Sequence, residues 1–232
     1  LAATDPRIRT FHQPNGGLSA ARNAGWSLAS AESKFIIFPD PDDVLEPSAL
    51  EELCEELESH PAAGAVLCHQ SMIDSDGRTL PGDGRRARWG KRFGLPRKLK
   101  DSDTTIPFLT FFCGTAAGPY VMWRRDVLEQ AGPWDINLAP WEDSDMFCRV
   151  ALLSEVRFLP RTLYRYRRHA TQATGNPEKM SRMYDLFRAK WEAYLSKDQE
   201  ITRRLQEARR FYWRIFRPLR TLGVMAKALR EF

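Results

Sequence analysis

The hydrophobic positions in the first 70 residues change period repeatedly, which predicts helix and strand in alternation. After the turn-forming residues 15–17, apolar residues recur at helical spacing, and Ser19 is the expected N-cap. Residues 35–38 form a short apolar run typical of a buried strand. A second amphipathic helix opens at residues 47–48, and residues 63–69 form a second buried strand. The order helix, strand, helix, strand predicts an α/β protein with a mostly parallel central sheet.

After residue 73 the chain is polar at first and then resumes a hydrophobic pattern. Residues 74–107 are basic and rich in Gly and Pro, which predicts a long loop or a mobile insertion. The apolar positions that follow predict, in order, a strand at 119–123, a short helix at 124–131, a helix opening at Trp141, short strands at 156–159 and 163–166, and helix from Pro177 to the end, interrupted at Pro218 and Gly223.

The composition places the chain among soluble globular proteins. Its 232 residues are 43% hydrophobic and 28% charged, which suits one large domain or one domain with an appendage. No apolar run reaches the roughly 18–20 residues that cross a bilayer. The four cysteines lie among apolar neighbours without a metal-binding spacing, which indicates buried free thiols and a reducing, cytoplasmic setting: Cys54, Cys68, Cys113 and Cys148.

The net charge of +5 is concentrated in two segments. Residues 85–100 carry eight Lys/Arg and no acid, and residues 203–232 carry nine Lys/Arg against two Glu. Such segments favour anionic partners, namely phosphorylated substrates, lipid headgroups or nucleic acid. Apolar residues recur at helical spacing through 203–222, so this helix either lies in an anionic membrane surface or packs on the domain with a solvated basic face. The basic segments are separate and match no nucleic-acid-binding module, so we expect no nucleic-acid partner.

Three carboxylates stand directly after the strand expected at residues 35–38: Asp40, Asp42 and Asp43. Carboxylate oxygens are the ligands that Mg²⁺ and Mn²⁺ prefer, and a bound divalent cation can in turn hold a diphosphate. Ligands of open α/β sheets bind beyond the carboxyl ends of the strands, so the position and the chemistry agree. The alternative interpretation is an Asp-rich turn, since Asp and Pro are both common turn residues.

Three further groups of residues accompany this aspartate cluster. They are N-G-G-L-S-A-A-R-N-A-G at 15–25, Trp141-Glu142-Asp143, and Tyr166-Arg167-Arg168-His169. In this order the four groups resemble the family 2 glycosyltransferases of the GT-A fold. Those enzymes carry an N-x-G-x-x-x-A-R-N-x-G helix start, an apolar strand ending in D-x-D-D, an E-D pair before a helix and a late R-x-H. The resemblance covers residues 7–175.

The resemblance implies an inverting, metal-dependent transferase. It would move a sugar from a nucleotide-diphosphate-sugar donor to a hydroxyl of a saccharide or lipid-linked acceptor, in cell-surface polysaccharide synthesis. Asp143 matches the family's general base, which takes the proton of the acceptor hydroxyl. Glu142 then either orients the acceptor or raises the proton affinity of Asp143. Without the resemblance, Glu142, Asp143 and Asp145 would be interpreted as first-turn acids of a surface helix.

The remaining roles are assigned on the same resemblance. Asp42 is expected to bind the metal, Mn²⁺ or Mg²⁺, and His169 matches a position that reaches the metal in several family members. Asp40 serves the metal or the ribose, and Asp43 acts through water or braces the turn; the choice between Asp42 and Asp43 for the metal stays open. The donor is expected to contact Arg22, Asn23, Asp40, Arg167 and Arg168, and the acceptor to contact Trp141, Arg88 and Trp89.

We expect two domains, a GT-A catalytic domain over residues 1–175 and a basic helical extension over 176–232. Family members begin with a strand, a helix and a strand ending in an Asp pair, which supply much of the pocket for the base and ribose. This sequence has no counterpart of that unit, so we interpret it as truncated at the N-terminal, nucleotide-binding side. The alternative function is a non-catalytic relic or regulatory module. The expected location is the cytoplasm, with peripheral attachment of residues 203–232 to the inner face of the cell membrane as an alternative.

Overall fold

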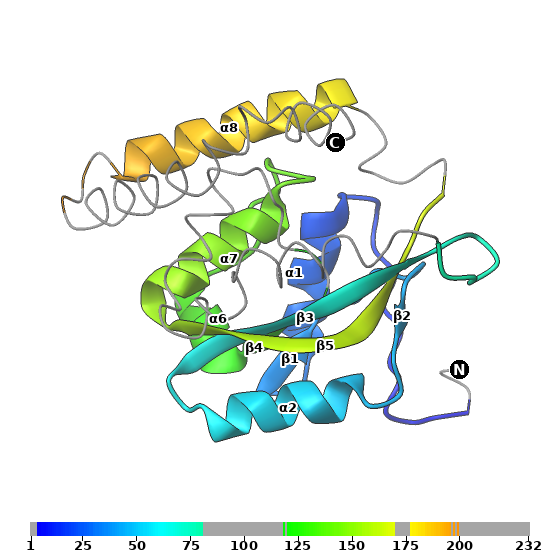
Figure 1. The fold of residues 1–232 in the computed structure, drawn as a ribbon. Coiled ribbons are helices and arrows are strands. Elements are labelled where there is room, and N and C mark those ends of the chain that lie inside the picture. The colour runs from blue at the N-terminus through cyan, green and yellow to red at the C-terminus, as the bar shows by residue number, and fades with distance from the viewer. Residues whose placement is uncertain are drawn as a thin grey trace, which may run out of the picture.

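The computed structural model describes residues 4–80, 118, 120–169, 177–195, 197 and 199. Within them one five-stranded sheet has the order β1-β4-β3-β5-β2. Its strands are β1 (Phe35–Ile37), β2 (Val44–Leu45), β3 (Ala63–Ile73), β4 (Val121–Arg124) and β5 (Glu155–Arg167). The helices are α1 (Leu18–Leu28), α2 (Ala49–Ser59), α6 (Arg125–Ala131), α7 (Glu142–Leu153) and α8 (Pro177–Leu195). One face of the sheet carries α2, the other carries α1, α6 and α7, and α8 lies outside α7 (Figure 1).

The α/β architecture is confirmed, but the strand directions differ from the expected mostly parallel sheet. Of the four strand pairs in the described part of the chain, β3–β5 is parallel and β1–β4, β3–β4 and β2–β5 are antiparallel. Because β1 and β3 are both antiparallel to β4, they run the same way, as the helix–strand order predicts. The strand β4 follows the segment 74–107 and enters between them in the opposite direction. The order of the preceding elements carries no information about that insertion.

A single strand, β5, replaces the two short strands expected at 156–159 and 163–166. The register against β3 shifts between Cys68↔Leu159 and His69↔Thr162, so Pro160 has no partner residue in β3. Proline has no N–H to donate to a strand ladder, and such an irregularity accommodates it without ending the strand. The last part of this continuous strand pairs with the neighbouring strand β2, with Tyr164 opposite Leu45 and Arg165 opposite Val44.

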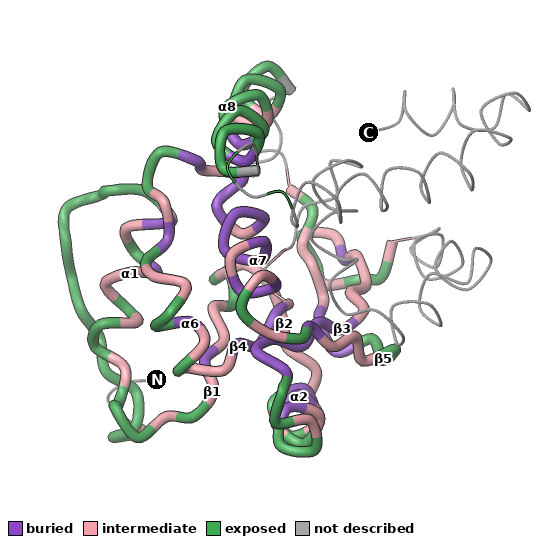
Figure 2. The backbone as a smooth tube through the Cα atoms, turned by 90° about the vertical axis from the view of Figure 1, so that its left-hand side faces the viewer, coloured by how far each residue is buried: buried purple, intermediate pink, exposed green. Residues whose placement is uncertain are grey.

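Two hydrophobic cores fill the space on either side of the sheet. The core facing α6 and α7 includes Leu67, Trp123 and Phe147, and the core facing α2 includes Leu53 and Leu57. Figure 2 shows the buried positions along α7 and on one side of α2. On α2 the buried positions form the apolar stripe that helical periodicity predicts, whereas those of α7 also include polar residues of its first turn.

The first helix, α1, differs from the other helices because its two buried residues are polar, Ser19 and Arg22. The N-cap is Gly17, with φ 85°, rather than the expected Ser19. Glycine adopts positive φ at little cost, and Ser19 lies inside the helix, where its Oγ donates to the main-chain carbonyl of Asp135 at 3.1 Å. The face of α1 that carries Arg22 is therefore turned toward the interior of the protein.

The helix α8 begins at Pro177, as the sequence predicts, and packs on α7 through aromatic side chains. Trp141, Phe187 and Trp191 share a core with Leu138 and Cys148. The first helix of the expected extension 176–232 therefore shares its core with the expected catalytic domain. Within the described residues, no helix combines the length and apolarity needed to cross a bilayer. The basic segments 85–100 and 203–232 and residue Cys113 lie outside the described residues.

Candidate active site

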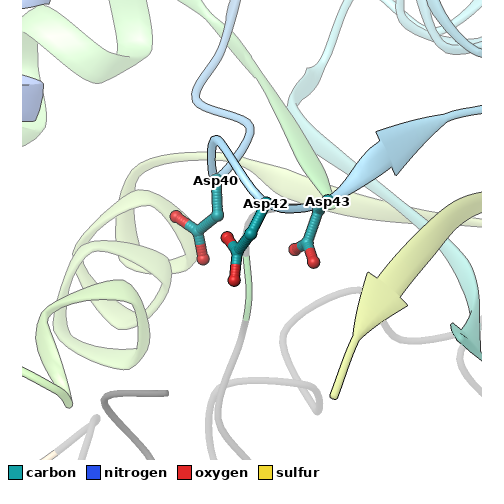
Figure 3. A group of neighbouring side chains, drawn as sticks. All are labelled: Asp40, Asp42 and Asp43. Carbon is teal, nitrogen blue, oxygen red and sulfur yellow. The ribbon is translucent and has the colours of Figure 1, made fainter. Parts of the chain in front are cut away.

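The three aspartates lie in the loop between β1 and β2, at the carboxyl end of β1. Figure 3 shows Asp40, Asp42 and Asp43 with their carboxylates on the same side of this loop. One carboxylate oxygen of each can be chosen so that all three lie within 4.8 Å of one another. The loop is closed by a main-chain hydrogen bond of 3.2 Å from the Asp43 N–H to the Asp40 carbonyl. The Asp-rich turn of the alternative interpretation is therefore the same loop that brings the three carboxylates together.

The end of β5 holds this loop in place. The Tyr164 hydroxyl donates to Asp43 Oδ2 at 2.7 Å and accepts from the Asp40 N–H at 3.2 Å. The Arg167 N–H donates to Asp43 Oδ1 at 2.7 Å, and His169 Nε2 lies 2.7 Å from Asp42 Oδ2. Both oxygens of Asp43 are therefore occupied by β5, an arrangement that suits the bracing role left open for this residue. Sequence reasoning missed Tyr164, which it placed only in the short strand expected at 163–166.

Arg22 joins the aspartate loop to the start of α7. Its Nη1 contacts Glu142 Oε1 at 3.0 Å and Asp143 Oδ1 at 2.5 Å, and its Nη2 contacts Asp40 Oδ1 at 3.2 Å. The Arg22 side chain is 5% exposed; its pair with Glu142 is buried, and its pairs with Asp143 and Asp40 are partly buried. Acids from two distant parts of the sequence thus meet around one guanidinium group.

The acids of α7 occupy the first turn of the helix, where the free N–H groups and the helix dipole favour negative charge. Glu142 is 1% exposed and Asp145 is fully buried, so they are not the surface acids of the alternative interpretation. Glu142 Oε2 is buried without a hydrogen-bond partner among the described residues. Asp145 has a structural task, because its carboxylate accepts from Trp191 Nε1 at 3.1 Å and pairs with Lys190 at 2.8 Å.

Burial changes the acidity of the cluster. It raises the pKa of Asp143 to about 7, with Glu142 and Asp40 adding to the rise and Arg22 opposing it. Burial likewise raises the pKa of Glu142 and of Asp40, and Arg22 again opposes it. Burial alone would lower the pKa of Arg22, but the three carboxylates outweigh it and raise that pKa. Asp143 can therefore exchange a proton near neutral pH, as a general base must.

The residues present at the loop fit a divalent cation. Arg22 contacts Oδ1 of Asp40 and not the second carboxylate oxygen of that residue. Asp42 is half-exposed and contacts the imidazole of His169. Carboxylate oxygens with one imidazole are a donor set that Mg²⁺ or Mn²⁺ accepts. The carboxylate of Asp43, by contrast, is already engaged by β5.

The structure gives other partners to Asn23 and Arg167, two of the expected donor contacts. The Asn23 amide donates to the Trp134 carbonyl at 3.0 Å and accepts from the Trp134 N–H at 2.8 Å. The Arg167 guanidinium donates to the main-chain carbonyls of Asp42, Asp74 and Ser75 at 2.7, 2.8 and 3.0 Å. Both side chains thus fix backbone segments next to the site. The Arg168 N–H donates to the Ile73 carbonyl at 2.8 Å, at the end of β3.

The structure places Trp141, one of the expected acceptor contacts, beneath α8. Its indole is buried beneath α8, with the ring of Phe187 stacked at 5.6 Å and its Nε1 donating to the Met180 carbonyl at 3.1 Å. An aromatic ring at the N-cap of α7 is used for helix packing, because α8 covers this position. The other two expected acceptor contacts, Arg88 and Trp89, lie outside the described residues.

Comparison with known proteins agrees with the motifs. A glycosyltransferase of Bacillus subtilis, the uncharacterized EpsJ, is 31% identical over 181 residues, which are 77% of this chain and 50% of that protein. The uncharacterized glycosyltransferase alr2836 of Nostoc sp. is 28% identical over 187 residues, 75% of this chain and 53% of that protein. The chain thus spans about half the length of these curated relatives. Among solved structures, S. aureus TarS 1-349 has a TM-score of 0.46 and 17% identity, covering 67% of this chain and 42% of that chain.

The family match covers more than half of the chain. Residues 1–130 match the family described as "Glycosyl transferase family 2". The matched segment includes α1 with Arg22 and the loop that carries Asp40, Asp42 and Asp43. The α/β fold and the ordered motifs agree with this match, and the chain belongs to glycosyl transferase family 2.

Proposed function

We propose that this site transfers a sugar from a nucleotide-diphosphate-sugar donor to a hydroxyl of a saccharide or lipid-linked acceptor, with inversion at the sugar carbon. One observation carries the proposal. Arg22 holds Asp40, from the aspartate loop, and Asp143, from the start of α7, on the same guanidinium. A donor diphosphate at the loop and an acceptor hydroxyl at Asp143 would then lie on either side of one reacting carbon.

On the donor side, Asp40, Asp42 and His169 are the residues that would hold a divalent cation. When bound, such a cation stabilises the negative charge that the departing diphosphate acquires. Arg167 keeps the loop in position through the Asp42 carbonyl. Asn23 fixes the Trp134 backbone beside the same site. We assign Arg168 to the diphosphate because a guanidinium matches phosphate oxygens in a bidentate geometry.

On the acceptor side, Asp143 takes the proton from the attacking hydroxyl. Its raised pKa makes the carboxylate basic enough to accept that proton at neutral pH. Glu142, buried beside it, adds negative charge and so increases that basicity. Attack from the face opposite the leaving diphosphate inverts the configuration of the sugar. We place the reaction in cell-surface polysaccharide synthesis at the cytoplasmic side of the membrane, with residues 203–232 binding anionic lipid.

The experiment is a transfer assay of the purified protein with Mn²⁺ and a panel of nucleotide sugars, comparing wild type with Asp143→Asn. We expect the variant to lose about 10²–10⁴-fold in transfer rate. Donor affinity, measured by calorimetry, should stay within about threefold of wild type because Asp143 acts on the acceptor. The matched control is Asp126→Asn, an exposed first-turn aspartate of α6, which should transfer at the wild-type rate. Donor binding without transfer by the wild type would favour the non-catalytic alternative.

A further inference from the structure

The hydroxyl of Tyr164 lies between the two ends of the aspartate loop. It accepts from the Asp40 N–H at 3.2 Å and donates to Asp43 Oδ2 at 2.7 Å. Tyr164 is 0% exposed, and its ring packs in the core between the sheet and α2. A buried ring in a packed core has little freedom, so the position of its hydroxyl is set by the fold rather than by the loop.

The same end of the loop is also fixed by the register of the sheet. Val44 and Leu45, directly after Asp43, pair with Arg165 and Tyr164 of β5. The Arg167 N–H occupies the second carboxylate oxygen of Asp43. Asp43 is therefore held at three points along β5, whereas the other end of the loop, at Asp40, meets β5 through the Tyr164 hydroxyl.

Three carboxylates held within 4.8 Å of one another repel, and a flexible loop would relax by moving them apart. A loop that is held closed places them close together before any cation arrives. The affinity of such a loop for a cation then depends on the group that keeps it closed, because outer partners orient metal ligands.

We propose that Tyr164 is a positioning residue that keeps the Asp40–Asp43 loop closed and thereby sets its affinity for a divalent cation. This inference rests on the cation binding in the proposed function. Tyr164 acts through Asp43 and the Asp40 backbone, and it touches neither the cation nor the sugar. In this arrangement Asp43 is the anchor of the loop, and Asp40, Asp42 and His169 supply the ligands.

The test is titration of the metal-free protein with Mn²⁺ alone, followed by electron paramagnetic resonance, for wild type and Tyr164→Phe. We expect Tyr164→Phe to bind Mn²⁺ about tenfold or more weakly. The matched control is Tyr194→Phe on α8, which removes a hydroxyl from a side chain that is 49% exposed and should leave the affinity unchanged. Thermal melting in EDTA shows whether each variant is folded. Equal Mn²⁺ affinity in wild type and Tyr164→Phe would overturn the inference and leave the proposed function intact.

A double-mutant cycle that combines Tyr164→Phe with Asp43→Asn tests whether the effect of Tyr164 on Mn²⁺ affinity passes through Asp43. Because Tyr164 acts through Asp43 as well as through the Asp40 backbone, the loss of Mn²⁺ affinity in the double variant should be smaller than the product of the two single losses. Losses that multiply would make the two residues independent and overturn the inference. Should Tyr164→Phe fail to fold, Asp43→Asn decides alone: an affinity for Mn²⁺ within twofold of wild type overturns the inference, because the Tyr164 hydroxyl would then hold a side chain that does not affect the cation. A wild type that binds no Mn²⁺ would instead remove the metal from the proposed function.

Discussion

The guanidinium of Arg22 and the carboxylate of Asp143 lie 2.5 Å apart, although 121 positions separate them in the sequence. Arg22 comes from α1 and Asp143 from the first turn of α7, two helices on the same face of the sheet (Figure 1). Because Arg22 also contacts Asp40, a single guanidinium group pairs with acids on both the donor side and the acceptor side of the proposed site. Its loss would leave three carboxylates facing one another in a largely buried cluster.

Arg22→Met should destabilise the protein by about 3–5 kcal/mol, since removing one member of a buried ion pair leaves uncompensated charge. The measurement is the free energy of unfolding in urea at pH 7.5. The control is Arg7→Met, whose ion pair with Asp5 lies on the surface, with the arginine 88% exposed. This control should leave the free energy of unfolding close to that of the wild type, because solvent screens an exposed ion pair. Equal effects of the two substitutions would contradict the buried role of Arg22.

The value of kcat/KM for sugar transfer should depend on pH near neutrality because of Asp143. Asp143 accepts a proton only when ionised, and its pKa of about 7 lies above the ordinary value of 3.8. Transfer kcat/KM should therefore be level above that pKa and fall about tenfold per pH unit below it. The measurement is kcat/KM for the acceptor from pH 5 to 9. The residual activity of Asp143→Asn provides the control and should lack this limb, and a limb that persists there would assign the titration to another group.

Much of the fold follows from local patterns in the sequence. The helices α2 and α7 and the strands β1 and β3 are fixed by apolar periodicity and by turn residues, which are properties of neighbouring positions. The direction of β4 depends on pairing with residues at least 54 positions earlier in the chain, such as Leu67 opposite Val121, and no local pattern encodes it. The continuity of β5 through Pro160 has the same origin, because the shift in register that accommodates the proline belongs to the pairing with β3.

The candidate site, too, could be predicted only in part from local sequence patterns. Asp40, Asp42 and Asp143 stand out in the sequence because acids directly after a buried strand and in a first helical turn match the ordered motifs of the family. Tyr164 does not stand out, since its ring belongs to the core and only its hydroxyl reaches the loop. The motif predicts an acceptor contact for Trp141, and the structure adds that α8 packs over its ring. Whether an aromatic ring is exposed depends on the helix that packs over it, which a motif cannot specify.

The packing of α8 on α7 should contribute strongly to stability. Phe187 is fully buried and stacks on Trp141, whereas the adjacent Leu186 is 48% exposed. Phe187→Ala should lower the free energy of unfolding by about 3–5 kcal/mol, because it leaves a cavity between the helices. Leu186→Ala, one position earlier on the same helix, should cost less than about 1 kcal/mol. Urea unfolding of the two variants measures the difference, and similar losses would contradict the packed arrangement of α8.

Replacement by alanine should change the free energy of unfolding in opposite directions at two glycines, Gly64 and Gly25. A Cβ on Gly64, in β3, would lie 2.7 Å from Val127 Cγ1 and 2.8 Å from Ser154 Cβ, closer than packed atoms approach. The Ser154 hydroxyl is tied to the Val150 carbonyl at 3.0 Å, so it cannot move aside without losing a hydrogen bond. Gly64→Ala should therefore destabilise the protein by about 1–3 kcal/mol.

Gly25 is the matched control, because a Cβ there meets no atom within 4 Å and the residue lies inside α1. Gly25→Ala should stabilise the protein by about 0.5–1 kcal/mol, since alanine restricts the unfolded chain and favours helix. Melting temperatures of both variants, measured with the wild type under identical conditions, decide the comparison. A rise for Gly64→Ala would mean that β3 and the end of α7 are not in the close contact described, and α7 would then not be held where Asp143 meets Arg22.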